Sequence, residues 1–127
     1  WISACKEHSI NSIFVVAPSS NDDRLKKVLS NCSGFVYAAS LMGVTGARSQ
    51  ISGAAEQLVN RIRQFTDLPV AVGLGVSTPE QARDVARFAD GVIVGSAFLN
   101  AVTTASDFQS GLAAVNKLAK ALKAGIS

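Results

Sequence analysis

Cysteines, aromatic residues and long apolar runs are scarce in this chain, and each shortage excludes a class of protein. The two cysteines, Cys5 and Cys32, are isolated and show neither metal-ligand spacing nor a CxxC motif. No apolar run approaches the roughly 18 residues of a membrane span, since the longest, 35–40 and 70–74, have the length of strands. The net charge of +3 is spread over predicted helices, without a basic stripe interleaved with aromatic residues. We therefore expect a cytoplasmic protein with reduced thiols, and neither nucleic acid nor a membrane as its partner.

The start of the chain lacks two further features. Residues 1–8 contain no initiator methionine and none of the basic, apolar and small-residue regions of a signal peptide. Their composition is instead that of the middle of a helix. We expect the sequence to be a fragment of a longer protein.

The sequence that is present alternates four times between a strand and a helix. Short apolar runs rich in β-branched residues predict four strands, over 12–16, 35–39, 68–74 and 91–94. Helical spacing of apolar residues predicts four helices, starting near Asp22 and covering 54–65, 79–89 and 106–124. Ser77 with Glu80 predicts a capping box at the start of the third helix, and Pro79 suits its first turn.

The predicted strands are apolar on both faces, which is typical of a parallel sheet covered by helices. Four parallel strands could form a small open sheet or half of a closed barrel. The loops favour the barrel, because barrels bind phosphate on the loops after their last two strands and at a short extra helix. Here glycine-rich turns follow the third and fourth strands, at 73–77 and 95–98. The sequence therefore predicts an α/β fold in which residues 1–127 form one domain, the last four βα units of a (β/α)8 TIM barrel.

Three glycine-bearing turns, at Gly46, Gly75 and Gly95, are expected at the same end of neighbouring strands. Glycine lets backbone N–H groups approach an anion without a Cβ in the way. The N–H groups after Gly95 open a helix, where unpaired donors and the helix dipole favour a phosphate. A glycine at one strand end is usually only a turn, but three at one face of one sheet indicate a phosphate site.

Four segments resemble a known family. They are GFVYAAS (34–40), GVTGA (43–47), GLGVSTPEQ (73–81) and GVIVGSA (91–97). In order and spacing they are similar to the tryptophan synthase alpha chain, and the pattern Tyr-x-x-Ser-x-x-Gly-Val-Thr-Gly over 37–46 is the most specific part. The Gly-x-Gly-Val-Ser and Gly-Ser-Ala motifs recur in other phosphate-binding barrels.

The resemblance implies a reaction and a partner. Indole-3-glycerol phosphate is cleaved by a retro-aldol step to indole and glyceraldehyde 3-phosphate, in tryptophan biosynthesis. Indole passes to a beta chain that carries pyridoxal phosphate, in an alpha2beta2 heterotetramer, so this chain itself needs no cofactor. No metal is implied.

The resemblance also implies roles for individual residues. The substrate phosphate is expected on Gly46, Gly75, Gly95 and Ser96. The substrate pocket is expected to be lined by Tyr37, Thr45, Leu74 and Ile93, with Tyr37 in a supporting place near the catalytic carboxylate. The glycine-rich segment from 43 to about 53 is expected to be a lid that excludes water and touches the beta chain.

No catalytic residue is expected within this sequence. The family's general acid and base, a Glu and an Asp, lie at and just after the second strand of the barrel, which this sequence does not contain. A retro-aldol step needs placed proton donors and acceptors. Asp22 and Asp23 suit a helix start, Asp67 and Asp90 precede strands, and Glu80 belongs to the predicted capping box. We therefore expect the full-length protein to be a lyase and this fragment alone to be inactive.

Two alternatives remain at this point. The chain could be a non-catalytic half-barrel that self-associates and binds phosphate esters, since its predicted sheet has two unpaired edges. It could also belong to another phosphate-binding barrel enzyme of tryptophan or histidine synthesis, which the 37–46 pattern disfavours. The single histidine, His8, has no nucleophile or acid at a triad-like spacing, so we do not expect it to be catalytic.

Overall fold

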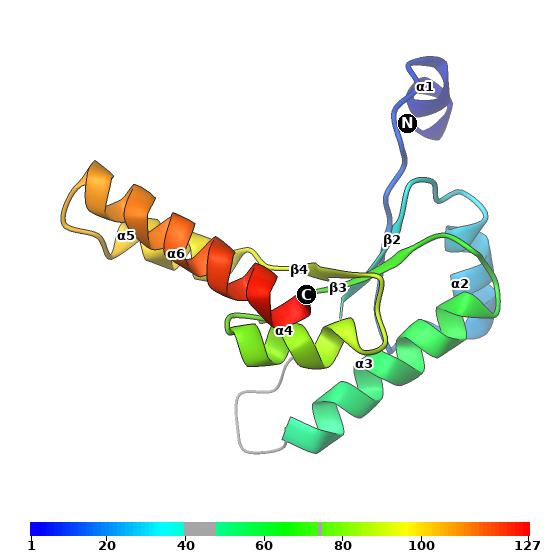
Figure 1. Ribbon diagram of the computed structural model, residues 1–127. Helices are drawn as coiled ribbons and strands as arrows, with labels where there is room; N and C mark the ends of the chain where they lie inside the picture. Colours follow the sequence, from blue (N-terminus) through cyan, green and yellow to red (C-terminus); the bar gives the residue numbers. More distant parts are fainter. Residues whose placement is uncertain (40–47, 74) are drawn as a thin grey trace.

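Four parallel strands form one sheet in the computed structural model, which describes residues 1–39, 48–73 and 75–127, and of residues 48–52 only the helical backbone (Figure 1). In sequence order and in spatial order they are β1 (Val15–Val16), β2 (Val36–Ala39), β3 (Val70–Gly73) and β4 (Gly91–Ile93). The helices are α1 (Ile2–Glu7), α2 (Asp22–Leu29), α3 (Arg48–Arg63), α4 (Pro79–Ala86), α5 (Ser96–Thr103) and α6 (Phe108–Ile126). The predicted fourfold alternation of strand and helix is therefore confirmed.

The register of the sheet decides which side chains share a face. Tyr37 pairs with Val15 on one side and with Ala71 on the other, and Gly73 pairs with Ile93. Val15 and Tyr37 alternate with the buried positions of their strands, and Ala71 and Gly73 lie two residues apart in β3. Because side chains alternate between the two faces of a sheet, these residues and Ile93 lie together on one face. Because the strands are parallel, their carboxyl ends meet at one edge, as in the barrels that bind ligands there.

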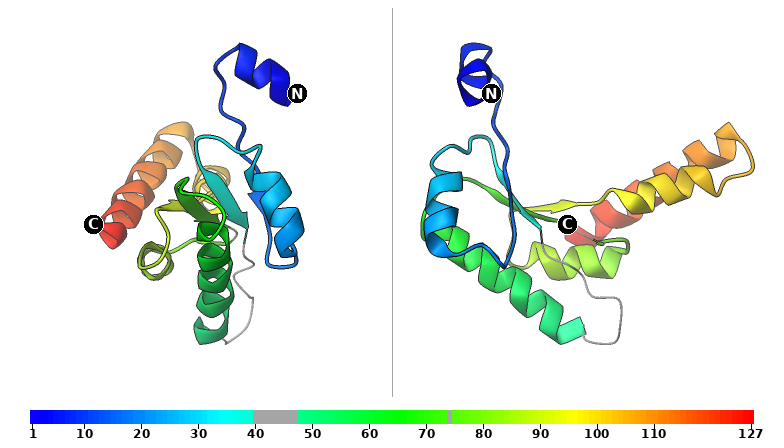
Figure 2. Two further views of the ribbon diagram at one scale, coloured as in Figure 1. Left: turned by 90° about the vertical axis from the view of Figure 1, so that its right-hand side faces the viewer. Right: turned by 180° about the vertical axis from the view of Figure 1, so that it is seen from behind.

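The other face of the sheet forms the hydrophobic core. Its alternate residues are fully or almost fully buried beneath the helices, and they are Val16, Val36, Ala38, Val70 and Val72. Leu58, Val59 and Ile62 of α3 are at most 1% exposed against them, and α2 and α4 add Leu25 and Val85. Figure 2 shows these helices on one side of the strands, so none of the helices that the structure describes covers the Tyr37 face.

Most element boundaries differ from the predicted ones by one to three residues, and the start of α3 differs by more. Helix α3 begins at Arg48, several residues before the predicted start at 54, so the second half of the predicted lid (43–53) is helical. Strand β1 is confined to Val15–Val16 within the predicted 12–16, although Ser33 N–H and Tyr37 N–H donate to the carbonyls of Ser12 and Phe14. Apolar periodicity missed the first turns of α3 because residues 48–53, RSQISG, offer only one large apolar side chain.

The two ends of the chain lie on opposite sides of the sheet. Helix α1 stands apart from the other elements at the end of an extended segment, and the α5–α6 hairpin projects from the β4 side (Figures 1 and 2). None of the helices in the described residues is long and apolar enough to cross a membrane.

Candidate functional site

The start of α4 is closed by its own side chains. Thr78 is the N-cap and its hydroxyl accepts a bond from the N–H of Gln81, while the Gln81 Oε1 accepts from Ser77 N at 2.8 Å and from Thr78 N at 3.2 Å. Pro79 in the first turn has no N–H to offer. The N–H groups of Ser77, Thr78 and Gln81 are therefore bonded within the turn, and these bonds fix its shape.

The capping box at this turn is one residue further along than predicted. The sequence favoured Ser77 with Glu80, but the reciprocal pair is Thr78 with Gln81. Both pairs fit the spacing of a capping box. Proline favours the first helical position, where its missing N–H costs no bond, so Pro79 makes Thr78 the N-cap.

The start of α5 is open, in contrast to that of α4. Its N-cap, Gly95, provides no side-chain cap, and a Cβ added there meets no atom within 4 Å. The first hydrogen bonds of the helix are donated by the N–H groups of Phe98 and Leu99 to the Gly95 carbonyl. The N–H groups of Ser96 and Ala97 come before these donors and have no acceptor within the helix. Unpaired donors at a helix start, aided by the helix dipole, form an anion site. Of the two helix starts that follow β3 and β4, α5 is the one suited to a phosphate.

Gly75 lies in the neighbouring turn and needs to be glycine. Its φ of +81° is in the left-handed region, which side-chain-bearing residues rarely adopt. The next residue, Val76, is only 2% exposed and anchors the turn in the core. The turn thus presents an exposed glycine backbone at the same edge of the sheet as the α5 start.

On the face of the sheet that carries Tyr37, the inner face, Tyr37 and Ile93 lie close against Gly73. A Cβ built on Gly73 would lie 2.8 Å from Ile93 Cβ, 2.8 Å from Tyr37 Oη and 2.9 Å from Tyr37 Cε2. Tyr37 pairs with Ala71 and yet its hydroxyl reaches Gly73, two residues further along β3, so its ring leans towards the carboxyl ends of the strands. The missing side chain of Gly73 lets Tyr37 and Ile93 approach each other at the end of the sheet where the glycine turns lie.

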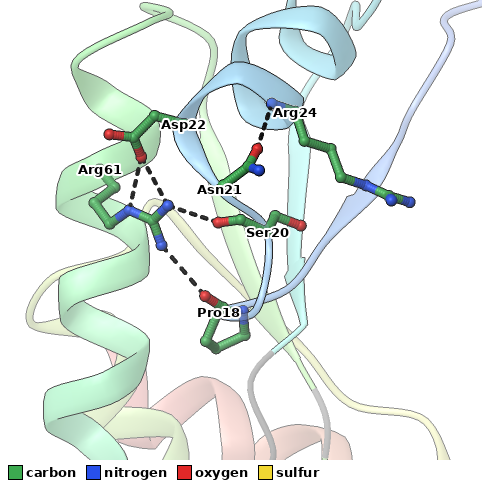
Figure 3. A network of polar contacts seen from close by, with 6 residues as sticks. All are labelled: Pro18, Ser20, Asn21, Asp22, Arg24 and Arg61. Atoms are coloured by element: carbon green, nitrogen blue, oxygen red, sulfur yellow. Dashed lines mark hydrogen bonds and ion pairs between the residues drawn. The ribbon is translucent and has the colours of Figure 1, made fainter.

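The loop after β1 is held against α3 by Arg61. The Arg61 guanidinium donates to the carbonyl of Ser20 at 2.6 Å and to that of Pro18 at 3.3 Å, and forms an ion pair with Asp22 Oδ1 at 2.7 Å (Figure 3). Asn21 caps α2 by accepting from Arg24 N in the same turn. One side chain thereby fixes the first of the loops at the carboxyl ends of the strands.

The acidic residues that have resolved pKa shifts serve structural roles. The pKa of Asp90 is below its ordinary value of 3.8. The main cause is the hydrogen bond that the Val70 N–H donates to its carboxylate, and the next is the hydrogen bond from the Arg63 guanidinium. This carboxylate lies at the amino end of β3, opposite the glycine turns. The N–H and hydroxyl of Ser110 lower the pKa of Asp107, the N-cap of α6, to about 2. Among the residues that the structure describes, no three His, Cys, Asp or Glu side chains form a group that could hold a metal ion.

The structure describes five of the eight predicted site residues. Tyr37 and Ile93 are brought together on the inner face, and Gly75, Gly95 and Ser96 lie at the carboxyl ends of β3 and β4. The three others, Thr45, Gly46 and Leu74, lie outside the described residues. His8, which was not expected to be catalytic, is exposed at the end of α1.

Comparison with known proteins bears on this arrangement. A sequence model of the family described as "Tryptophan synthase alpha chain" matches residues 1–127. The chain belongs to this family. It is 53% identical over 126 residues to the tryptophan synthase alpha chain of Acidothermus cellulolyticus, and 54% identical over 126 residues to that of Streptomyces avermitilis. In both comparisons the match covers 99% of this chain and 46% of the relative. The chain therefore spans about half the length of the curated relatives it matches.

Solved structures agree in fold. The tryptophan synthase of Mycobacterium tuberculosis in an aminoacrylate-bound form superposes with a TM-score of 0.83 at 42% identity, over 100% of this chain and 44% of the other. A mutant tryptophan synthase alpha-subunit of Pyrococcus furiosus superposes with a TM-score of 0.78 at 29% identity, over 97% of this chain and 48% of the other. The predicted fold class is confirmed: the four parallel strands and their helices are half of a TIM barrel of this family.

Two features of the site were not predicted from the sequence. Gly73 was noticed only as part of a motif, although the alternation of β3 would place it on the inner face beside Tyr37 and Ile93. The contact between Arg61 and the loop after β1 joins residues about 40 positions apart, and no local pattern in the sequence indicates it.

Proposed function

We propose that this chain is the phosphate-holding C-terminal half, a single domain, of a tryptophan synthase alpha chain. In the complete protein it acts in tryptophan biosynthesis on indole-3-glycerol phosphate, which a retro-aldol cleavage converts to indole and glyceraldehyde 3-phosphate. The observation that carries the proposal is the open start of α5 beside the left-handed turn at Gly75. Membership of the family supplies the reaction.

The substrate phosphate is held mainly by backbone N–H groups. The donors are those of Gly75, of Gly95 with Ser96 at the open helix start, and of Gly46. No lysine or arginine needs to reach the anion, because helix donors and the helix dipole together stabilise it. The bonds that cap the α4 start also fix the shape of the loop after β3, in which Gly75 lies.

The indole ring lies against the inner face of the sheet. Tyr37 and Ile93 form one wall, and Thr45 and Leu74 complete the pocket. The wall is largely apolar, as suits an aromatic ring, and the Tyr37 hydroxyl supplies a polar group towards the reacting end of the substrate. Tyr37 therefore positions the substrate without itself delivering the protons of the reaction.

The remaining chemistry lies outside these 127 residues. The general acid and base are carboxylates of the other half of the barrel, so this half alone releases no indole. The partner is a tryptophan synthase beta chain in an alpha2beta2 heterotetramer, which holds pyridoxal phosphate, while this chain carries no cofactor. The assembly works in the cytoplasm.

The proposed phosphate-binding site is tested by titrating the ¹⁵N-labelled chain with glycerol 3-phosphate and following its backbone N–H resonances. We expect saturable shifts at Gly75, Gly95 and Ser96. In Ser96→Asp a fixed carboxylate occupies the anion position, so affinity falls by about tenfold or more, although the charge favours the helix dipole. The matched control, Gln109→Asp, adds the same charge to the first turn of α6 and leaves binding unchanged. Equal affinity in Ser96→Asp and the wild-type chain would show that the phosphate binds elsewhere.

The catalytic assignment is tested by mixing the chain with a separately produced first half of the Acidothermus cellulolyticus relative and adding indole-3-glycerol phosphate. We expect indole release from the mixture, none from either half alone, and a marked loss when the Ser96→Asp chain is used. Cleavage by this chain alone would contradict the placement of the acid and base in the other half.

A further inference from the structure

The last turn of α6 rests directly on the first turn of α4. A Cβ built on Gly125 would lie 2.6 Å from the Pro79 carbonyl oxygen, and 3.2 Å from both the carbonyl carbon and the Cα of Pro79. All three are backbone atoms, which cannot turn aside as the end of a flexible side chain can. Glycine permits so close an approach between two backbones because it has no Cβ. Gly125 therefore sets the distance between the two helices at this point, where Figure 1 shows the end of α6 beside α4.

Two further contacts hold the two helices together at the same place. The Arg83 Nε of α4 donates a hydrogen bond to the Gly125 carbonyl at 3.3 Å. Leu122 of α6 and Ala82 of α4 are buried, and both belong to the hydrophobic core. A close backbone approach, a hydrogen bond and apolar burial therefore all fix the position of α6 on α4.

The first turn of α4 is continuous with the turn at Gly75. Gln81 Oε1, in the turn that Pro79 opens, accepts a hydrogen bond from Ser77 N at 2.8 Å. Val76, between Ser77 and Gly75, is buried in the core. Gly75 itself has a φ of +81°. Because Ser77 is bonded and Val76 is buried, a displacement of Pro79 is passed on to the backbone of Gly75.

We propose that Gly125 is a positioning residue for the phosphate site. By seating α6 on Pro79 it holds the first turn of α4, and with it the Gly75 turn, where the Gly75 N–H reaches the phosphate. Arg83 assists by joining the two helices at Gly125. Gly125 touches no substrate and acts only through Pro79 and the bonds of the turn. This inference rests on the proposed function, since it concerns the same phosphate.

The proposal is tested on the ¹⁵N-labelled chain, first without ligand and then with glycerol 3-phosphate. In Gly125→Ala we expect the Gly75 N–H resonance to move before any ligand is added, because the turn is displaced. The affinity for glycerol 3-phosphate should fall by about threefold to tenfold, since a hydrogen bond to a charged group is weakened. Both measurements are made well below the thermal midpoint of the variant, so that unfolding does not contribute to the loss.

Two other variants accompany Gly125→Ala. Gly111→Ala is the matched control, because Gly111 is also a buried glycine of α6 but its Cβ would meet no atom closer than 3.5 Å, an ordinary contact distance. It should leave the Gly75 resonance and the affinity unchanged. Arg83→Met removes the hydrogen bond to the Gly125 carbonyl and should move the same resonance by a smaller amount. This second variant decides the question if Gly125→Ala does not fold.

Three results would overturn the proposal. If Gly125→Ala lowers the thermal midpoint but keeps the wild-type Gly75 resonance and affinity, the contact serves stability alone. If Gly111→Ala weakens binding as much as Gly125→Ala, any disturbance of α6 has the same effect. If Gly125→Ala does not fold and Arg83→Met leaves both readouts unchanged, α6 does not act on the turn. A wild-type chain without saturable shifts is a different failure, because it removes the proposed phosphate site and this inference with it, whereas in the three results above the wild-type chain binds.

Discussion

The inner face of the sheet depends on the absence of a side chain at Gly73, and adding one methyl group there is the sharpest test of the site. In Gly73→Ala the new Cβ would lie 2.8 Å from Ile93 Cβ and 2.8 Å from Tyr37 Oη. Carbon atoms in contact prefer separations of about 3.5–4.0 Å. The Tyr37 hydroxyl is the far end of a side chain and can move away, but Ile93 Cβ is fixed to the backbone of β4. The strands themselves must therefore shift.

The size of the effect follows from two opposing terms. Overpacking by one methyl group costs about 1–3 kcal/mol when neighbours cannot move freely. Replacing glycine by alanine recovers about 0.5–1 kcal/mol, because the unfolded chain loses conformational freedom. We expect a net loss of about 1–2 kcal/mol of unfolding free energy. With a urea slope of about 2 kcal/mol per M, the unfolding midpoint falls by roughly 0.5–1 M.

Urea unfolding followed by far-UV circular dichroism measures this loss. Gly53→Ala is the matched control: a Cβ at that position in α3 meets no atom within 4 Å, so it should stabilise the chain by about 0.5–1 kcal/mol. Combining Gly73→Ala with Tyr37→Ala should recover part of the cost, with a coupling on the order of 0.5–1 kcal/mol. Equal stabilisation by the alanines at 73 and 53, or strict additivity of the changes at 37 and 73, would refute the packing described for this wall.

Three further predictions concern contacts that hold the site in place. Arg61→Met should lower the unfolding free energy in urea by about 1–3 kcal/mol, because two loop carbonyls lose their hydrogen-bond donor. Asp22→Asn removes only the ion pair and should lower it by less than about 1 kcal/mol. Equal losses in the two variants would mean that the ion pair dominates. Asp90→Asn should lower stability at neutral pH. The folded pKa of Asp90 is below 3.8, so its contribution is present above that pH and is lost as the pH falls through the lower folded value. The gap between wild type and variant should therefore close in acid, and a gap independent of pH in a urea series from pH 7 to 2 would contradict this. Gly125→Ala should destabilise the docking of α6, because its Cβ would lie 2.6 Å from the Pro79 carbonyl oxygen; an unchanged thermal midpoint would argue against this contact.

The local pattern of the sequence was enough to predict the elements and their order. Apolar runs on both faces of each strand, helical spacing in between and glycines at the strand ends each depend on residues close together in the chain. The start of α4 shows the limit of such patterns, because two overlapping capping boxes fit equally well and Pro79 decided between them. The early start of α3 was missed because a helix can begin with polar residues when its later turns pack well.

The sequence by itself thus determined the class of the fold, the parallel direction of its strands and the edge at which the glycine turns meet. Local side chains also distinguish the two helix starts: Gln81 Oε1 accepts from Ser77 and Thr78 at α4, whereas Gly95 has no side chain that could cap α5. Tertiary structure brought Tyr37 and Ile93 together across Gly73, over a separation of 56 residues in the chain, and placed the loop after β1 against Arg61. The physical reason is one of range. Propensity and periodicity act over a few residues, whereas a missing Cβ has consequences only through the atoms that the fold places beside it.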